Sequence, residues 1–340
     1  MTVLRTFGWA AGVTAAVLVA TLVVWGPGAL ASVAVLGVLE VSLSFDNAVI
    51  NATVLRRMGA FWQRMFLTVG ILIAVFGMRL FLPLLVVSAA ARLGPGSVLD
   101  MAVRDPDRYA EHLDRAHPAI AAFGGMFLLM IAADFLLTER DIRWLAPLER
   151  ALARAGRLDR AAVLFALGVL LVSAVTLAQP EALTTTLVAG LLGLLTYLLV
   201  GGLSQHFEQQ GRTSDGTTAV GAVGRAAFFL FLYLEVLDAS FSFDGVVGAF
   251  AISRNIFQIA LGLGIGAMFI RSLTVHLVRR GTLDNYVCLE HGAHYAIGAL
   301  AVILFLTLRY DVAQAVTSGV GVALITAAFL SSLVRNRRGP

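Results

Sequence analysis

A five-residue pattern occurs twice in this chain, as Ser42-Leu43-Ser44-Phe45-Asp46 and as Ser240-Phe241-Ser242-Phe243-Asp244. Each copy places a carboxylate within an apolar stretch long enough to cross a lipid bilayer. A charged side chain at the bilayer centre costs roughly 2.5–3.5 kcal/mol on insertion scales, so such residues usually have a function. We call the two copies the first frame and the second frame. Together they predict a functional site where two membrane segments meet.

The composition is that of a membrane protein. The chain of 340 residues is 59% hydrophobic and 14% charged, whereas soluble domains contain about 25% charged residues. The single cysteine, Cys288, excludes an intramolecular disulfide and a cysteine-rich metal site. The net charge of +4 does not indicate nucleic-acid binding, because the basic residues are all arginines and most lie between the apolar segments.

The apolar segments predict an all-α, polytopic fold with about ten transmembrane helices, as a single membrane domain over residues 1–340. The first segment could instead be a signal peptide, because Arg5 precedes it and Ala29-Leu30-Ala31 follows it. Gly26-Pro27-Gly28 separates it from the second segment and favours a tight turn. The ten segments are 8–25, 29–54, 65–90, 119–138, 161–179, 183–203, 226–252, 256–277, 292–308 and 313–334.

The arginines predict an orientation. With ten spans, 17 arginines fall on one side and 6 on the other, and two lie inside spans. The positive-inside rule then places both termini in the cytoplasm, in the inner (plasma) membrane. Among the polar connections, 91–118 is an outer loop, 139–160 is a basic helix near the headgroups, and 204–224 is a flexible linker loop.

The two frames belong to a longer internal repeat with an offset of 198 residues. Glu40 and Asp238 each stand six residues before the aspartate of their frame, and an arginine, Arg79 or Arg271, follows in the next span. The repeats would be 1–179 and 183–340, with about five spans each. An odd number of spans inverts the second copy, as in secondary transporters that bind their substrate between inverted repeats.

The polar side chains of the repeat predict a metal site at a broken helix. Serines that bond to the backbone can bend a helix, and interrupted helices supply ion ligands at the midplane. Oxygen ligands without soft ones suit Mg²⁺, Ca²⁺ or Mn²⁺. We expect Asp46 and Asp244 to be paired ligands, helped by Asn47, Glu40, Asp238 and Glu235. The supporting residues are Ser42, Ser44, Ser240, Ser242, Arg79, Arg271 and Asn51.

Two interpretations of the buried arginines remain open. Five carboxylates against two guanidiniums leave an excess of negative charge, which favours a bound cation. Alternatively, each arginine neutralises one acidic side chain and holds the repeats together. In that case, asparagine in place of aspartate would disturb folding more than transport.

The stretches Leu39-Glu40-(x)5-Asp46-Asn47 and Leu234-Glu235-(x)8-Asp244 resemble the two acidic signatures of the TerC-like integral membrane proteins. The resemblance covers about residues 30–308, and Gly245 after the second aspartate departs from it. That family is associated with tellurium resistance, has an Alx-type branch that exports Mn²⁺, and is related in architecture to LysE-type exporters. The resemblance implies that Glu40, Asp46, Asn47, Asp238 and Asp244 handle metal.

These observations predict a secondary transporter that exports a divalent cation, with Mn²⁺ as the expected substrate. We expect no enzymatic activity and no cofactor. The expected partners are the lipid bilayer, the metal ion and a second copy of the chain, but no nucleic acid. One alternative is a non-transporting scaffold of a tellurium or metal stress response, and the basic 139–160 segment would then recruit partners. Another is an intramembrane enzyme at Glu290-His291-x-x-His294, although interfacial histidines explain that motif better.

Overall fold

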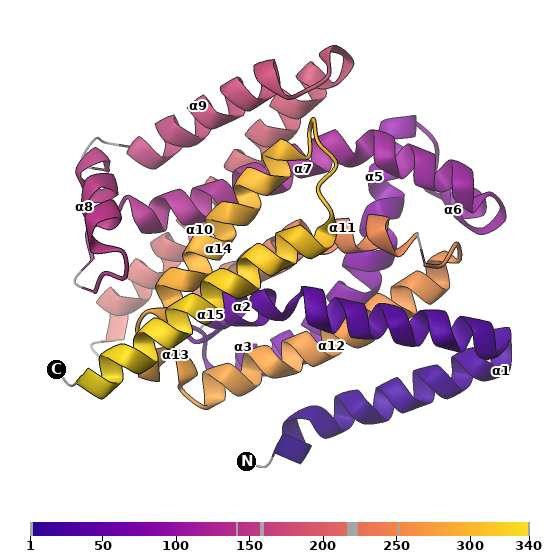
Figure 1. Cartoon of the computed structure of the whole chain (residues 1–340), viewed down its shortest axis with the longest axis horizontal. Coiled ribbons are helices and arrows are strands. Elements are labelled where there is room, and N and C mark those ends of the chain that lie inside the picture. Colours follow the sequence, from indigo (N-terminus) through magenta and orange to yellow (C-terminus); the bar gives the residue numbers. More distant parts are fainter. Residues whose placement is uncertain (1–2, 141, 157–159, 216–223, 251, 339–340) are drawn as a thin grey trace. The chain divides into compact units, whose positions relative to one another are not determined.

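The computed structural model describes residues 3–140, 142–156, 160–215, 224–250 and 252–338 (Figure 1). Within these ranges every regular element is a helix, which confirms the all-α class. The elements are α1 (Val3–Leu43), α2 (Phe45–Leu55), α3 (Ala60–Leu67), α4 (Val69–Leu72), the π-helical η1 (Ile73–Phe81), α5 (Leu82–Ala91), α6 (Pro95–Arg104), α7 (Pro106–Leu136), α8 (Ala146–Ala155), α9 (Ala161–Thr176), the short 3₁₀ turn η2 (Pro180–Ala182), α10 (Leu183–Asp215), α11 (Gly224–Ala249), α12 (Ile256–Arg279), α13 (Thr282–Asn285), α14 (Leu289–Leu306) and α15 (Gln314–Arg338).

Seven helical stretches of the described chain are long and apolar enough to cross a membrane. This agrees with a polytopic all-α membrane protein, because a span needs about 20 apolar residues. The stretches are Phe7–Leu43, Ala60–Ala91, Pro106–Leu136, Pro180–Leu203, Ile256–Arg279, Leu289–Leu306 and Gln314–Arg337. Neither the shorter α9 nor α11, which contains the second frame, is among them.

Helix α1 consists of two arms that meet at Gly26, and the chain doubles back there (Figure 1). The backbone of Gly26 has φ +82° and ψ −176°, a conformation open essentially only to glycine. Pro27 follows directly and cannot continue the hydrogen bonding of the first arm. The predicted break between the first two apolar segments is therefore confirmed.

The chain packs as two compact units, and each of them combines three separate stretches. Unit 1 comprises Met1–Ala48, Ala60–His117 and Phe241–His276. Unit 2 comprises Val49–Gly59, Pro118–Ser240 and Leu277–Pro340. Each unit thus draws on both predicted repeats, 1–179 and 183–340.

Glycines bring helices into backbone contact inside unit 1. A Cβ atom on Gly262 would lie 2.5 Å from Leu36 Cβ, and one on Gly266 would lie 2.4 Å from Glu40 Cβ. These two glycines are one turn apart on α12, so the second arm of α1 lies directly on their backbone. Close approach at small residues is a general way for membrane helices to pack.

Unit 2 contains an antiparallel pair of neighbouring helices, α14 and α15 (yellow-orange to yellow in Figure 1). A Cβ atom on Gly292 would lie 2.4 Å from Ala328 Cβ, so the two helices touch without intervening side chains. One turn further toward the same end of the pair, the backbone N–H of Cys288 donates to Ser332 Oγ at 2.9 Å. Cys288 is a buried free thiol that packs in this helix pair.

The predicted linker 204–224 is partly helical. Residues 204–215 continue helix α10, and 224 begins α11. Residues 216–223 lie outside the described residues, so the rest of the linker prediction falls there. The helix continues through 204–210 because these residues include neither glycine nor proline. Residues that are typical of turns appear only from Gly211 onward.

Candidate functional site

The first frame lies at a break between two helices. Helix α1 ends at Leu43, α2 begins at Phe45, and Ser44 between them forms a bend. The hydroxyl of Ser42 donates to the carbonyl of Val38 at 2.8 Å, a bond that competes with regular helix geometry. The predicted helix interruption is therefore confirmed for the first frame.

Asp46 occupies the first turn of α2, where the helix dipole favours negative charge. The residue is buried, with 7% of its surface exposed. Its Oδ1 atom accepts the backbone N–H of the next residue, Asn47, at 3.1 Å. No described cation forms an ion pair with Asp46, so its charge is met only by backbone dipoles.

Glu40, one and a half turns before Asp46, is neutralised. Its Oε1 atom accepts a hydrogen bond from Arg79 Nη2 at 2.5 Å, and 6% and 3% of the two side chains are exposed. The same guanidinium donates from Nη1 to the carbonyl of Ala74 at 2.9 Å. Ala74 is five residues before Arg79, a spacing that the π-helical turn of η1 accommodates. For this pair, the structure agrees with the interpretation that an arginine neutralises an acidic side chain.

The contact of α1 with α12 fixes where Glu40 sits. Gly266 is buried directly against Cβ and Cγ of Glu40, and the carbonyl of Gly37 is nearby, 3.1 Å from where a Cβ would be. Because no side chain separates the helices here, the carboxylate of Glu40 can only extend toward η1. The sequence pattern of α12 contained this signal, since Gly262 and Gly266 form a small-xxx-small pair.

Asn51 is a second buried polar residue on α2. It lies one turn after Asn47 and has no exposed surface. Neither its Oδ1 nor its Nδ2 atom has a hydrogen-bond partner among the described residues. An unsatisfied buried amide of this kind costs about 1–3 kcal/mol, so the face of α2 that carries Asn47 and Asn51 is able to bind a further polar group.

The second frame differs from the first in local structure. It lies within the uninterrupted helix α11, so the prediction of a broken helix is wrong for this copy. The hydroxyl of Ser240 nevertheless donates to the carbonyl of Val236 at 2.9 Å, which is the bond of Ser42 displaced by 198 residues. Ser242 is buried, and its hydroxyl has no partner among the described side chains and backbone.

Two of the remaining predicted ligands are buried in unit 2. Glu235 and Asp238 are 4% and 7% exposed, and they lie on the part of α11 that belongs to unit 2. The side chain of Asp244 lies outside the described residues. Over the described part of the chain, no three His, Cys, Asp or Glu side chains form a cluster that could hold a metal ion. The six-residue metal site therefore stays a prediction.

The second intramembrane arginine is also buried in unit 1. Arg271 is 1% exposed and donates from Nη1 to the carbonyl of Phe66 at 3.3 Å. Its guanidinium lies over the ring of the same phenylalanine, 4.3 Å from the centroid. Both arginines thus hold helices of unit 1 together, which the sequence pattern predicted only in outline.

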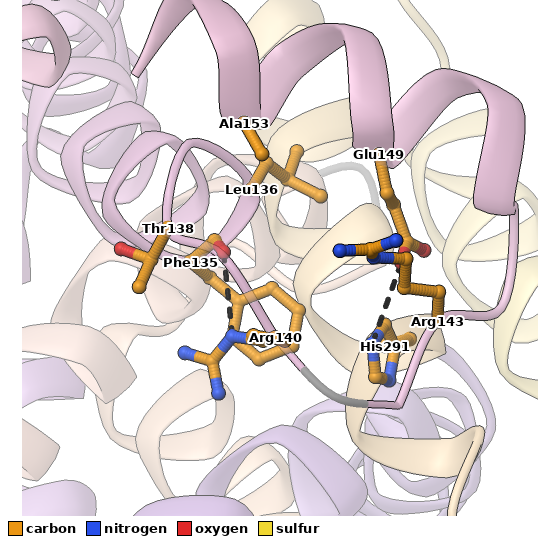
Figure 2. Close-up of a pocket in the computed structure, with 8 residues that line it drawn as sticks. All are labelled: Phe135, Leu136, Thr138, Arg140, Arg143, Glu149, Ala153 and His291. Atoms are coloured by element: carbon orange, nitrogen blue, oxygen red, sulfur yellow. Dashed lines mark hydrogen bonds and ion pairs between the residues drawn. The ribbon is translucent and has the colours of Figure 1, made fainter. Parts of the chain in front are cut away.

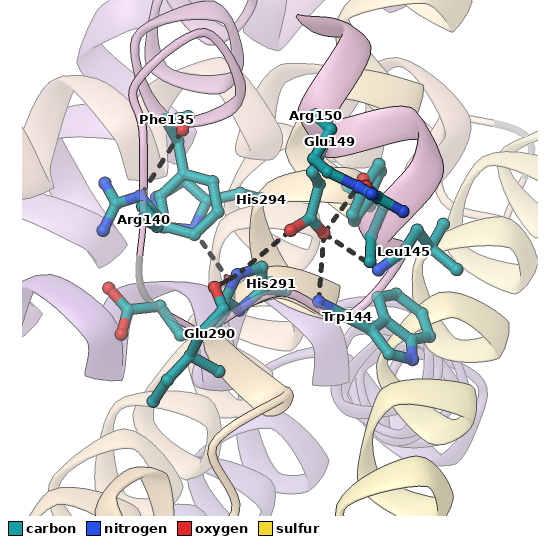
Figure 3. A network of polar contacts seen from close by, with 12 residues as sticks. Phe135, Arg140, Trp144, Leu145, Glu149, Arg150, Glu290, His291 and His294 are labelled. Carbon is teal, nitrogen blue, oxygen red and sulfur yellow. Dashed lines mark hydrogen bonds and ion pairs between the residues drawn. The ribbon is translucent and has the colours of Figure 1, made fainter. Parts of the chain in front are cut away.

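A polar network that the sequence analysis did not identify lies in unit 2 (Figure 3). Glu149 is 7% exposed, and its Oε1 atom accepts the backbone N–H groups of Trp144 and Leu145 at 3.2 and 3.0 Å. The hydroxyl of Tyr295 donates to the same oxygen at 3.2 Å. Glu149 therefore caps the N-terminus of α8 and joins it to α14. An acidic residue in the first turn after a proline was the available sequence signal.

The histidines of the Glu290-His291-x-x-His294 motif make structural contacts in the same network. His291 Nε2 lies 2.9 Å from the carbonyl of Ile142 and 3.7 Å from Glu149. His294 Nδ1 lies 2.8 Å from the carbonyl of Glu290, and its ring stacks on Phe135. Because carbonyl groups accept the bonds of both rings, these contacts fit the interpretation of the motif as interfacial histidines.

A small cavity of about 10 Å³ adjoins this network (Figure 2). It has room for about one water-sized group. Its polar walls come from Thr138, Arg140, Arg143, Glu149 and His291. The guanidinium of Arg140 lies 3.8 Å from the centre of the Phe135 ring, and Arg143 extends beside Glu149 (Figure 2).

The described helices define an all-α protein with seven candidate membrane spans. More specifically, the chain belongs to the family described as "Protein of unknown function (DUF475)", which matches residues 45–339 and thus most of the chain. The match includes Asp46 and the second frame and begins after Glu40. No curated protein and no solved structure matched the chain. The resemblance to TerC-like proteins therefore stays a prediction.

Proposed function

We propose that this protein is a secondary transporter that exports a divalent cation, with Mn²⁺ as the expected substrate. The observation that supports it best is Asp46, a buried carboxylate without a cationic partner among the described residues, at a helix break. Removing a carboxylate from water costs several kcal/mol unless an opposite charge compensates it. A transported cation, replaced by a proton when it leaves, would supply that charge.

The neighbouring residues narrow the proposed site. Because Glu40 is paired with Arg79, we assign Glu40 to positioning and Asp46 and Asn47 to binding. The unsatisfied amide of Asn51 offers an oxygen one turn further along α2. Asp244 would complete the site from the second repeat, and Glu235 and Asp238 would line the route. Carboxylate and amide oxygens are the ligands that hard divalent cations prefer.

The proposed topology has ten crossings in two inverted repeats. It counts the two arms of α1 as separate spans and adds α9 and α11 to the other candidate helices. It also places the protein in the inner membrane, with both termini in the cytoplasm. The matching serine bonds of α1 and α11 support the repeat, since they are related by the same 198-residue offset.

Flux into proteoliposomes tests the proposed function. Vesicles that contain an Mn²⁺-quenched dye are compared for the wild type, for Asp46→Asn, and for Asp100→Asn. We expect Asp46→Asn to lower the Mn²⁺ flux at least about tenfold, the effect of losing roughly 1.4 kcal/mol of binding. Asp100 is the matched control, because it forms an exposed pair with Arg104 that contributes little.

Two results would reject the proposal. One is a wild-type flux no greater than that of empty vesicles, which would favour the scaffold alternative. The other is an Asp46→Asn variant that transports Mn²⁺ as fast as the Asp100→Asn control. Circular dichroism of the purified variants shows whether a loss of flux comes from a loss of helix.

A further inference from the structure

The segment from Leu137 to Gly156 contains α8, and its two ends meet, so that it forms a closed loop. A Cβ atom on Gly156 would lie 1.9 Å from the carbonyl oxygen of Leu137, so the two ends of the segment are in direct backbone contact. Glu149 and His291 fasten the segment to α14 through the bonds described above. We call it the α8 segment, without residue 141, which lies outside the described residues. Its orientation on unit 2 is therefore well defined by these contacts.

The anchored face of α8 determines which side chains point outward. Glu149 and Ala153 are buried one turn apart. Ile142, Leu145 and Leu148 are 38%, 41% and 46% exposed, although they are large and apolar. Arg150 and Arg154, also one turn apart, are exposed on another face of α8. A short helix with exposed leucines on one flank and arginines on another is typical of helices that lie in the membrane interface.

Two arginines line the cavity, and Glu149 lies on the same wall. Arg140 donates to the carbonyl of Phe135 at 3.4 Å and stacks on its ring, and neither Arg140 nor Arg143 forms an ion pair with a described residue. Burial lowers the pKa of Arg140, and the charges of Glu290 and Glu149 offset part of this effect. Arg140 is exposed and Arg143 is half-buried, so an anion can approach both guanidiniums from outside and accept charge-assisted hydrogen bonds from them.

His291 adds one ring nitrogen without a hydrogen-bond partner. The residue is 5% exposed and lines the cavity. Its Nδ1 atom has no hydrogen-bond partner within the described chain, whereas Nε2 is bonded to a carbonyl. The guanidiniums of Arg140 and Arg143 are the hydrogen-bond donors that face the cavity, which has room for about one oxygen atom of an anion.

We propose that the α8 segment binds an anionic phospholipid, with a phosphate oxygen in the cavity between Arg140 and Arg143. The acyl chain lies against Ile142, Leu145 and Leu148, and the rest of the headgroup remains outside. A phospholipid fits better than a soluble phosphate compound for two reasons. The cavity is too small for a whole metabolite, and the exposed apolar side chains beside the arginines require an apolar ligand. The proposal concerns lipid binding and does not depend on cation transport.

Lipid titration of the purified full-length protein tests this site. Phosphatidylglycerol is added to the protein in neutral detergent, and native mass spectrometry records the fraction of protein with bound lipid. We expect Arg140→Gln with Arg143→Gln to weaken binding roughly tenfold or more, because each arginine near an anionic lipid contributes about a factor of five. Arg335→Gln with Arg337→Gln is the matched control, since it removes the same charge from exposed positions of α15.

Further arms identify the ligand. Leu145→Ser with Leu148→Ser keeps the arginines and should also weaken binding, whereas phosphatidylcholine should bind weakly to every variant. Inorganic phosphate at equal concentration should not displace the lipid. The Arg140→Lys and Arg143→Lys variant should retain most of the binding, because lysine keeps both positive charges.

Three outcomes overturn the proposal. The first is equal binding by the wild type and the Arg140→Gln, Arg143→Gln variant. The second is an equal loss in the α15 control, which would show a general charge effect. The third is efficient displacement by inorganic phosphate, which would make the site one for a free anion.

Discussion

At the scale of single residues, two nearby buried carboxylates differ in whether they have a cationic partner. Glu40 is paired with Arg79 at 2.5 Å, whereas Asp46 is buried and accepts a hydrogen bond only from the backbone N–H of Asn47 among the described residues. The difference follows from the position of η1, whose arginine is directed toward Glu40 of α1, about one turn before the helix break. A buried pair that is broken on one side leaves an uncompensated charge.

We therefore expect Arg79→Gln to destabilise the protein by about 3–5 kcal/mol, since it leaves Glu40 buried without its partner. Adding Glu40→Gln should recover part of the loss. Thermal unfolding in detergent measures both variants. Arg104→Gln is the control, because the exposed pair of Arg104 with Asp100 should contribute less than about 1 kcal/mol. Purely additive losses in the double variant would contradict an ion pair.

At the scale of elements, the contact between α1 and α12 depends on glycines. Gly266 and Gly262 allow the backbone of α1 to approach so closely that a methyl group would overlap with Glu40 or Leu36. This contact places Glu40 opposite η1 and thereby leaves Asp46, on the other side of the break, as the carboxylate without a cation. The short helix α2 then presents Asn47 and Asn51 one turn apart.

Gly266→Ala should accordingly destabilise the protein by about 1–3 kcal/mol, because overpacking at a tight contact forces the helices apart. Gly168→Ala on α9 is the matched control, since a Cβ atom there would meet nothing within 4 Å. That variant should be neutral or slightly stabilised, as alanine is the better helix former. Relative to the wild type, the thermal unfolding midpoint of Gly266→Ala should fall, and that of Gly168→Ala should stay the same or rise slightly. Equal midpoints would mean that the α1–α12 contact yields easily.

At the scale of the whole molecule, both compact units combine segments from the two predicted repeats. The basic α8 segment belongs to unit 2, and the proposed orientation puts it on the cytoplasmic side, where arginines are more frequent. Anionic lipids are also concentrated in the cytoplasmic leaflet of many membranes. The proposed topology and the proposed lipid site are thus consistent with each other, although each has its own test.

A fluorescent-protein and phosphatase fusion pair checks the orientation. Fused after residue 340, the fluorescent protein should fold and emit, and the phosphatase should be inactive, because that terminus is expected in the cytoplasm. An insertion of the phosphatase near Asp100, in the predicted outer loop, should be active. An active phosphatase at the C-terminus would reject the proposed topology, which places both termini in the cytoplasm.

Several properties followed from the amino-acid sequence alone. The low charge content and long apolar segments predicted an all-α membrane protein, because a bilayer admits only hydrogen-bonded helices or closed barrels. The Gly26-Pro27 turn and the break beside Asp46 were predicted as well, since glycine, proline and serine act on the backbone within a few residues. These features depend on residues that are close together in the sequence, so the sequence pattern predicts them.

Only the tertiary structure decided which buried charges have partners. The sequence placed five carboxylates and two arginines in predicted spans, and it did not indicate which of them would pair. It did not predict that Arg79 would pair with Glu40, or that Arg271 would bind the carbonyl and ring of Phe66. Likewise, nothing local predicted that Glu149 would fasten α8 to Tyr295 and α14. The physical reason is that an ion pair or a cap between helices depends on distances across the packed structure, and residues far apart in sequence set those distances.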